Sequence, residues 1–298
     1  MHQPAAADEQ VLIGAEELAR DLDAFTVLHA TVAFPKPRFD GDYRPESGHG
    51  IWREAHIPGS LHADLLGGFS APNARLHFTR PTPDALAAAL AELGVTPDAE
   101  IVVYDEGGTT WASRLWWMLR NIGVRARVLD GGFARWTALG LPVETGDTPA
   151  RPAAPVRTGP TDRGLWRDRE DVLAVVTGDA PGSLVCALDA EQFAGTATTR
   201  YARRGHITGS RNLPAKSLLD EGLLRPVEQV AGRADAVLAG ASKPLILYCG
   251  GGVSACLLAL ALVRAGHEEI TVYDGSLEEW TADPALPMTT LTEGEGGS

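Results

Sequence analysis

The sequence predicts an α/β protein of two tandem domains, each built on a mostly parallel sheet flanked by helices. The first observation is an internal duplication: "IVVYDEGGTTWASRLWWMLRNIGVRARVLDGGFARW" from Ile101 matches "LILYCGGGVSACLLALALVRAGHEEITVYDGSLEEW" from Leu245, at a constant separation of 144 residues. A second pair, "AHIPGS" from Ala55 and "GHITGS" from Gly205, lies upstream in each half. Two copies indicate a duplicated domain rather than a solenoid. Strand-like and helix-like segments alternate in each copy, which is typical of a largely parallel sheet.

The boundary between the copies is a proline-rich segment, "DTPARPAAPVRTGP". Such segments form fairly stiff linkers. We therefore expect an N-terminal domain over residues 1–146, a linker over 147–160 and a C-terminal domain over 161–298.

Individual elements follow from short apolar runs and from helix start and stop signals. In the first half we predict strands at 27–28, 101–104 and 127–129, and helices at 83–93 and 111–122. In the second half, Cys186 lies in a predicted strand, and 245–248 is a short buried strand. A helix begins at Ser254, and Gly266 stands where its C-cap would be.

Composition narrows the class of protein. The chain has 298 residues, of which 44% are hydrophobic, so two ordinary domains can each bury a core. A formal net charge of −13 argues against nucleic-acid or anionic-membrane partners. No apolar run has membrane-spanning length, and the opening "MHQPAAADEQ" lacks a signal-peptide pattern. Three cysteines do not suggest a disulfide framework, so we expect a cytoplasmic protein.

A cysteine followed by three glycines stands between the 245–248 strand and the next helix. The loop Cys249-Gly250-Gly251-Gly252-Val253-Ser254 is at the carboxyl end of its strand, where α/β domains bind ligands. Glycines let backbone N–H groups converge, and a helix N-terminus adds a partial positive charge. Such a loop would favour a thiolate on Cys249. Ser254 is expected to cap the helix, with a hydroxyl donor to the sulfur as the alternative.

The duplicated motifs resemble the tandem rhodanese-domain sulfurtransferases, which include thiosulfate and 3-mercaptopyruvate sulfurtransferases. "AHIPGS", "LWWMLRNIGVRARVLDGGFARW", "GHITGS", "YCGGGVSAC" and "VYDGSLEEW" match in order and spacing, from about Val11 to Trp280. The resemblance implies two rhodanese-like domains and a catalytically silent first one, where Asp105 occupies the position equivalent to Cys249. It also implies that Cys249 carries a persulfide held by the loop amides, with no metal or organic cofactor.

The implied partners are a small anionic sulfur donor and an acceptor: cyanide, a low-molecular-weight thiol or thioredoxin. Thiosulfate enzymes of the family resemble Cys-Arg-Lys-Gly-Val-Thr, and mercaptopyruvate enzymes resemble Cys-Gly-Ser-Gly-Val-Thr. Gly250 favours mercaptopyruvate, although Gly251 replaces a serine proposed to join a proton relay. A thiosulfate sulfurtransferase proper is one alternative. A non-catalytic sulfur-carrier or binding protein is another, since family substrate residues are missing.

Candidate donor-binding residues also come from the resemblance. Gln192, in "CALDAEQFAGT", stands where an arginine is expected. Arg200, Arg203 and Arg204 form a basic patch that could hold the donor carboxylate or could be a solvated loop. Arg114 is expected toward the cleft or in an ion pair on a helix surface.

Other residues have competing interpretations. His56 is expected to be structural, since His206 repeats it, and an acid–base relay with Asp40 or Asp42 is the alternative. Cys256 is expected to be buried and inert, and Trp116 and Trp117 to pack in the core or domain interface. Glu278 and Glu279 are interpreted as charges on a solvated helix face.

Overall fold

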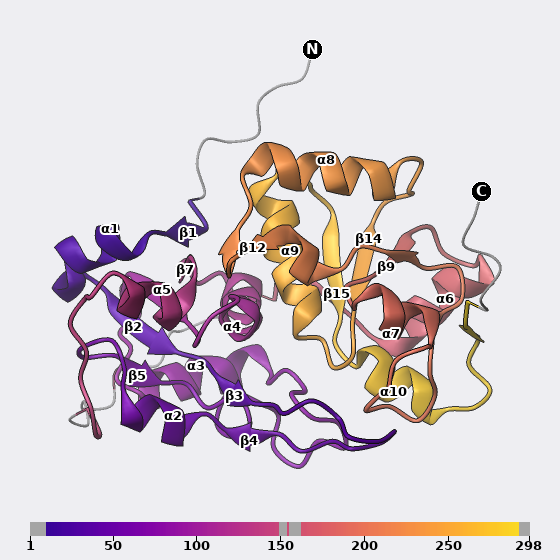
Figure 1. Cartoon of the computed structure of the whole chain (residues 1–298). Coiled ribbons are helices and arrows are strands. Elements are labelled where there is room, and N and C mark those ends of the chain that lie inside the picture. Colours follow the sequence, from indigo (N-terminus) through magenta and orange to yellow (C-terminus); the bar gives the residue numbers. More distant parts are fainter. Residues whose placement is uncertain (1–9, 149–153, 155–161, 292–298) are drawn as a thin grey trace.

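The computed structural model describes residues 10–148, 154 and 162–291, so most of the predicted linker lies outside the described residues. The chain forms two five-stranded sheets with the strand orders β1-β7-β6-β2-β5 and β11-β9-β14-β15-β8 (Figure 1). All neighbouring strands within both sheets are parallel. The predicted fold of two α/β domains is confirmed.

The elements of the first half are β1 (Leu12–Ile13), α1 (Ala15–Arg20), η1 (Leu22–Ala24), β2 (Thr26–His29), β3 (Val32–Ala33), β4 (Glu46–Ser47), α2 (His49–Glu54), β5 (Leu61–His62), α3 (Pro83–Glu92), β6 (Ile101–Tyr104), α4 (Thr110–Asn121), β7 (Ala126–Leu129) and α5 (Gly132–Ala138). Those of the second half are β8 (Trp166–Arg167), α6 (Arg169–Thr177), β9 (Ser183–Cys186), α7 (Ala190–Ala194), β10 (His206–Ile207), β11 (Arg211–Asn212), η2 (Ala215–Leu218), β12 (Leu219–Asp220), β13 (Leu223–Leu224), α8 (Val227–Leu238), β14 (Leu245–Tyr248), α9 (Ser254–Arg264), β15 (Ile270–Tyr273), α10 (Ser276–Ala282) and β16 (Met288–Thr289).

The sequence duplication is also a structural one. β6, β7 and α5 recur as β14, β15 and α10 with both bounds shifted by the 144 residues that separate the two sequence copies. α4 and α9 begin at equivalent positions and differ in their last turn. Gly266 has a φ of +82° just after α9, as predicted for a helix stop.

The repeated His-Ile-x-Gly-Ser motif has a packing role in both halves. The backbone N–H of Ile207 donates to the Tyr248 hydroxyl at 3.1 Å, and that hydroxyl donates to Ser210 at 2.9 Å. The first half repeats both contacts around the hydroxyl of Tyr104. The motif therefore connects the tyrosine at the end of a central strand to the neighbouring segment by hydrogen bonds. This shared contact explains why the motif occurs in both copies.

The two domains share a buried interface. α4 and α9 pack against each other between the two sheets (Figure 1), and their side chains belong to one continuous hydrophobic cluster. Trp116 and Trp117 are buried within it, as predicted. None of the described helices combines the length and apolar composition needed to cross a membrane. The packing brings the loops before α4 and α9 into the space between the domains.

Candidate active site

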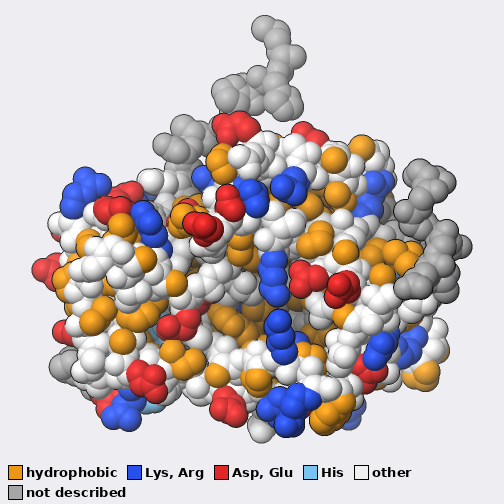
Figure 2. All heavy atoms as spheres, viewed as in Figure 1, with side chains coloured by type: hydrophobic (Ala, Val, Ile, Leu, Met, Phe, Trp, Pro, Cys, Tyr) orange, Lys and Arg blue, Asp and Glu red, His pale blue; other side chains and the backbone are white. Residues whose placement is uncertain are grey.

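A cavity of about 600 Å³ lies between the domains and reaches Cys249. Figure 2 shows a hollow between the two halves, with hydrophobic side chains inside it and Lys or Arg side chains beside it. The lining residues from the first half are Phe34, Lys36, Pro37, Tyr43, Phe78, Gly107, Thr110 and Trp111. Those from the second half are Ala187, Leu188, Asp189, Glu191, Gln192, Ala197, Thr198, Arg200, Tyr201, Lys216, Cys249, Gly250, Gly251, Val253 and Ser254.

The Cys249 loop is held in place by the helix that follows β15. The Cys249 backbone N–H donates to the Ser276 hydroxyl at 3.1 Å, and the Cys249 carbonyl accepts from Leu277 at 3.2 Å. The Gly250 carbonyl accepts from the N–H of Glu278 at 2.8 Å. Cys249 itself is buried, so a donor must reach it through the cavity.

The equivalent loop of the first domain shows what this loop shape can bind. Asp105, at the position equivalent to Cys249, is buried, and its carboxylate accepts four backbone hydrogen bonds. The N–H groups of Gly107 and Thr109 donate to Oδ1 at 3.0 and 3.2 Å. Those of Trp111 and Ala112 donate to Oδ2 at 2.9 and 3.2 Å. The loop before α4 is therefore an anion cradle filled by its own side chain.

The equivalent cradle around Cys249 has unpaired donors. Within the described residues, none of the five backbone N–H groups from Gly250 to Ser254 donates a hydrogen bond. The carbonyl contacts that position the two loops are alike: Phe133 donates to Asp105 as Leu277 does to Cys249. Unpaired amides beside a sulfur, at the start of a helix, can stabilise a negative charge on or beyond that sulfur.

Ser254 does not cap α9. Val253 is the N-cap residue of this helix, and no side chain caps it. Ser254 is the first residue of the helix and lines the cavity, which corrects the preferred interpretation of this residue.

Arg114 supports the cradle and does not line the cavity. This residue of α4 is 1% exposed, and its guanidinium donates to the carbonyls of Gly252 and Phe78 and to Asp274 at 2.6 Å. It also stacks 4.6 Å from the Trp166 ring centroid. Neither predicted position, toward the cleft or in an ion pair on the helix surface, is correct. Arg114 is buried and links the first domain to the Cys249 loop of the second domain by hydrogen bonds.

Two of the predicted donor-binding residues line the cavity, Gln192 and Arg200. The Arg200 guanidinium lies 4.0 Å from the Phe34 ring centroid and donates to the Pro35 carbonyl, while its buried Nε has no partner within the described residues. Lys36 and Lys216 also line the cavity. No sequence pattern marks these two lysines, because only the fold brings them to the cavity that reaches Cys249.

The other two arginines of the basic patch are engaged elsewhere. Arg203 donates to the carbonyls of Trp280, Thr281, Asp283 and Leu286 and so holds the end of α10. Arg204 pairs with Asp40 at 2.9 Å on the surface. Neither residue lines the cavity, so the structure does not bring them to the donor.

His56 and Asp40 do not meet. His56 is buried, stacks on Trp52 and bonds the Trp52 carbonyl through Nδ1 at 2.8 Å. His206 bonds the Phe193 carbonyl in the same way. The geometry supports the expected structural role, because Asp40 is paired with Arg204 and a His56–Asp40 relay has no contact to act through.

The remaining cysteines are buried. Cys256 lies within α9 with its thiol directed at the Gly252 carbonyl, 3.1 Å away, and burial raises its pKa to about 12. Cys186 ends β9, and burial likewise raises its pKa to about 12. Both thiols stay protonated at neutral pH, as expected of inert core residues.

Four residues near the loop were missed or misread from the sequence. The Tyr201 hydroxyl occupies the space in which a Cβ on Gly250 would lie. A Cβ on Gly251 would lie 3.4 Å from the Tyr43 hydroxyl and 3.5 Å from Glu278. Tyr43 donates to Glu278 at 3.2 Å, and His77 pairs with Glu278 at 2.7 Å.

Glu278 is therefore not on a solvated face. Its side chain is 14% exposed and joins two residues of the first domain. Burial and the Glu278 charge raise the pKa of Tyr43, which stays protonated.

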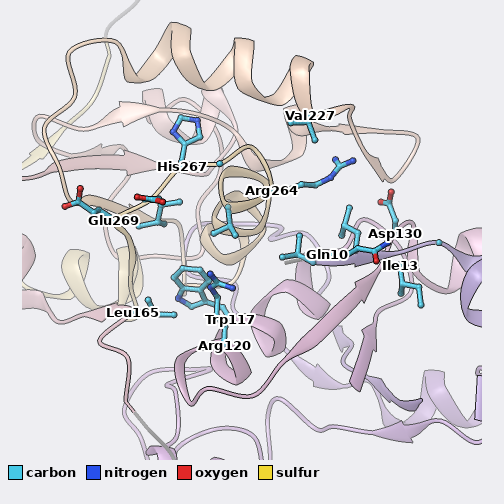
Figure 3. Close-up of a pocket in the computed structure, with 17 residues that line it drawn as sticks. Gln10, Ile13, Trp117, Arg120, Asp130, Leu165, Val227, Arg264, His267 and Glu269 are labelled. Carbon is cyan, nitrogen blue, oxygen red and sulfur yellow. The ribbon is translucent and has the colours of Figure 1, made fainter. Parts of the chain in front are cut away.

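A second cavity, of about 880 Å³, lies at the other end of α9 (Figure 3). Arg264, at the end of that helix, lines it, together with Trp117 and Asp130 from the first half. Because a helix rises about 1.5 Å per residue, the two ends of α9 are roughly 16 Å apart. This cavity does not reach Cys249.

Comparison with known proteins assigns the family. Residues 38–139 and 184–283 each match the family model described as the rhodanese-like domain. The chain is 35% identical over 253 residues to the probable 3-mercaptopyruvate sulfurtransferase of Pseudomonas aeruginosa, with 83% of this chain and 88% of the relative covered. It is also 35% identical over 248 residues to the thiosulfate sulfurtransferase of Gallus gallus, with 80% and 84% covered.

A solved structure agrees with these relatives. The crystal structure of SseA from Escherichia coli, described as showing the rhodanese fold of 3-mercaptopyruvate sulfotransferases, superposes with a TM-score of 0.76 at 30% identity. The match covers 90% of this chain and 98% of that one. The chain therefore belongs to the rhodanese-like family and is a sulfurtransferase built from two rhodanese-like domains.

Proposed function

We propose that this sulfurtransferase takes sulfur from 3-mercaptopyruvate, carries it as a persulfide on Cys249 and passes it to a thiol or cyanide. The observation that carries this proposal is the set of unpaired amides from Gly250 to Ser254 around a buried cysteine. The filled cradle at Asp105 is an internal example of the same loop holding an anion.

The reaction has two covalent steps. The Cys249 thiolate attacks the donor sulfur, the carbon–sulfur bond breaks, and its electron pair leaves with the carbon as the enolate of pyruvate. The proton of the donor S–H ends on that carbon, which gives pyruvate and a persulfide anion. The terminal sulfur of the persulfide carries the negative charge, which the loop amides stabilise without reorganising. An acceptor thiolate or cyanide then attacks this terminal sulfur and restores Cys249.

The cavity walls favour a carboxylate donor. Arg200, Gln192 and Lys36 supply positive charge and an amide to a space that also reaches Cys249. A guanidinium and an amide can together bind the carboxylate of mercaptopyruvate. The loop itself has no cation at positions 250 and 251, whereas the Cys-Arg-Lys-Gly-Val-Thr pattern that the family resemblance implies for thiosulfate enzymes has two.

Thiosulfate is the second candidate donor, because the chain is as similar to a thiosulfate sulfurtransferase as to a mercaptopyruvate enzyme. Lys36, Lys216 and Arg200 would have to meet its sulfonate from the cavity wall. For the acceptor we propose a low-molecular-weight thiol or thioredoxin. All three cysteines are free thiols, which suits a reducing compartment, and we place the protein in the cytoplasm.

Initial rates with the two donors at matched concentrations test this proposal, with cyanide and dithiothreitol as acceptors and Cys249→Ser as the blank. We expect faster transfer from mercaptopyruvate, no transfer by Cys249→Ser and retained transfer by Cys256→Ser. Faster transfer from thiosulfate would overturn the donor. Absence of transfer from both would favour a sulfur-carrier or binding role.

A further inference from the structure

The Tyr201 hydroxyl occupies the place of a side chain that the Cys249 loop lacks. Tyr201 lies between α7 and β10 and is 9% exposed. Its hydroxyl fills the space that a Cβ on Gly250 would need, and the tyrosine lines the cavity together with Cys249. Residue 250 therefore has to be glycine. The polar group at this point of the cavity wall is the Tyr201 hydroxyl rather than a side chain of residue 250.

Two tyrosine hydroxyls lie next to the loop, those of Tyr43 and Tyr201, and only the Tyr43 hydroxyl has a hydrogen-bond partner among the described residues. The Tyr43 hydroxyl donates to the Glu278 carboxylate at 3.2 Å, and that carboxylate is fixed by His77. Within the described part of the chain, no hydrogen bond involves the Tyr201 hydroxyl. Because Tyr201 lines the cavity, a molecule bound there can accept a hydrogen bond from this hydroxyl.

The electrostatic surroundings keep this hydroxyl protonated. Burial raises the pKa of Tyr201, and the negative charge of Cys249 raises it further. Tyr201 is therefore present in the cavity as a neutral O–H donor rather than as a phenolate.

We propose that Tyr201 is a further catalytic residue, whose hydroxyl passes a proton to the carbon that leaves the donor sulfur. This role rests on the proposed mercaptopyruvate donor. When Cys249 attacks, the carbon–sulfur bond breaks and the methylene carbon of the enolate needs one proton to become the methyl group of pyruvate. Tyr201 gives its proton to that carbon and takes up the proton of the donor S–H. The persulfide is left as an anion, and Tyr201 ends as it began.

Thiosulfate provides an internal control for this role. Attack on its outer sulfur breaks a sulfur–sulfur bond and releases sulfite, which is stable as an anion, so no carbon has to be protonated. A proton-transferring hydroxyl should therefore affect one donor, whereas a hydroxyl that merely shapes the loop should affect both.

The test is single-turnover persulfide formation and steady-state kinetics for the wild type, Tyr201→Phe and Tyr273→Phe, with both donors. Tyr201→Phe removes only the oxygen. Tyr273→Phe is the matched control, because its hydroxyl bonds Glu279 at 2.8 Å and Tyr273 does not line the cavity. For Tyr201→Phe we expect kcat with mercaptopyruvate to fall by about 10²-fold, the usual size of general acid–base catalysis, with little change in KM. The rate of persulfide formation from thiosulfate should stay within about threefold of the wild-type rate, because this donor needs no proton transfer to carbon. Tyr273→Phe should match the wild type with both donors.

The role is overturned if Tyr201→Phe loses both donors equally or keeps its full rate with mercaptopyruvate. It is also overturned if Ser254→Ala, which removes the other hydroxyl next to the loop, shows the donor-selective loss in place of Tyr201→Phe. A wild type that loads from thiosulfate and never from mercaptopyruvate would instead overturn the proposed donor and this role with it.

Discussion

Arg200 combines a fixed position with a free donor. Its guanidinium is held by the Phe34 ring and the Pro35 carbonyl, so that its planar group is oriented before a donor arrives. Its Nε is buried without a partner within the described residues and belongs to a residue that lines the cavity. Preorganised cations bind carboxylates with little loss of side-chain entropy.

Replacing Arg200 should weaken donor binding more than it slows the chemistry. For Arg200→Gln we expect KM for mercaptopyruvate to rise by about 10- to 100-fold, since a hydrogen bond to a charged group contributes about 1.5–3 kcal/mol. Arg204→Gln is the matched control, because its ion pair with Asp40 is exposed and outside the cavity. Steady-state kinetics of both variants check this, and an equal rise in KM would contradict it.

Asp105 makes stability depend on pH in a defined direction. Burial raises the pKa of its carboxyl from 3.8 to about 6. The folded state therefore holds the proton more tightly than the unfolded state between about pH 4 and pH 6. The stabilisation is present in full below this window and is lost as the pH rises through it, at no more than about 1.4 kcal/mol per unit.

The corresponding experiment compares chemical unfolding of the wild type and Asp105→Asn across this window. Titration of other carboxyl groups is common to both chains and cancels in the difference. We expect the stability of the wild type relative to Asp105→Asn to fall between pH 4 and pH 6 and to level off at pH 7. If this difference rose with pH instead, the four amide hydrogen bonds would have lowered the pKa of Asp105 by more than burial raises it.

At the scale of residues, the sequence predicted Cys249 as the reactive centre and gave no sign of several of the residues that surround it in the structure. Cys249 and its glycines are contiguous, so their role follows from a local pattern. Tyr43 and Tyr201 are brought to the loop by tertiary packing, and no local signal marks them. Arg203 is an arginine, as expected of a residue that binds an anionic donor, but its guanidinium donates its hydrogen bonds to carbonyls near the end of α10.

At the scale of elements, the loop before α9 tolerates no side chain at position 250. A Cβ on Gly250 would collide with the Tyr201 hydroxyl and ring. We expect Gly250→Ala to reduce persulfide formation from both donors by at least about tenfold, because overpacking that displaces a site costs about 1–3 kcal/mol.

The double variant Gly250→Ala/Tyr201→Ala separates this clash from other effects. It removes the ring that the new methyl group meets, so loading from thiosulfate should recover. Recovery shows that Tyr201 is what excludes the side chain. Single and double variants with equal rates of loading would contradict the explanation.

Helix α4 reaches the loop of the other domain through Arg114. We expect Arg114→Ala to lower the free energy of unfolding by about 3–5 kcal/mol, since it leaves the largely buried Asp274 charge and the Gly252 carbonyl without this partner. Transfer should slow as well, although Arg114 does not line the cavity. Arg80→Ala is the control, because its side chain makes an ion pair at 3.7 Å with the exposed Asp168, worth no more than about 1 kcal/mol. Equal denaturation midpoints for the two variants would contradict this account.

The central elements were predictable and the short ones were not. The duplication and the apolar runs placed β6, β14, α4 and α9 to within a residue at their starts. The two-residue pairs β3–β4, β12–β13 and β10–β16 have no repeating pattern of their own. Their pairing is set by neighbouring elements, which local patterns do not record.

At the scale of the whole molecule, one fold occurs twice and the two copies differ in the residue that begins the cradle, Asp105 in the first and Cys249 in the second. In the first copy the anion is the Asp105 side chain, so the cradle is closed to ligands. In the second, Cys249 leaves the amides unpaired within the described residues. The first domain then contributes the opposite wall, including Phe34, Lys36 and Tyr43. A complete site therefore requires both halves. The duplication in the sequence indicated that there are two halves, but only their packing in the structure shows which residues they bring together.

The measurement that tests this account most directly is the intact mass of the protein after exposure to 3-mercaptopyruvate without an acceptor. We expect a gain of one sulfur atom, lost again on addition of cyanide, in the wild type and in Cys256→Ser. We expect no gain in Cys249→Ser. A wild type that turns over the donor without ever gaining sulfur, or a Cys249→Ser chain that gains it, would contradict the central claim that the Gly-rich loop holds a persulfide on Cys249.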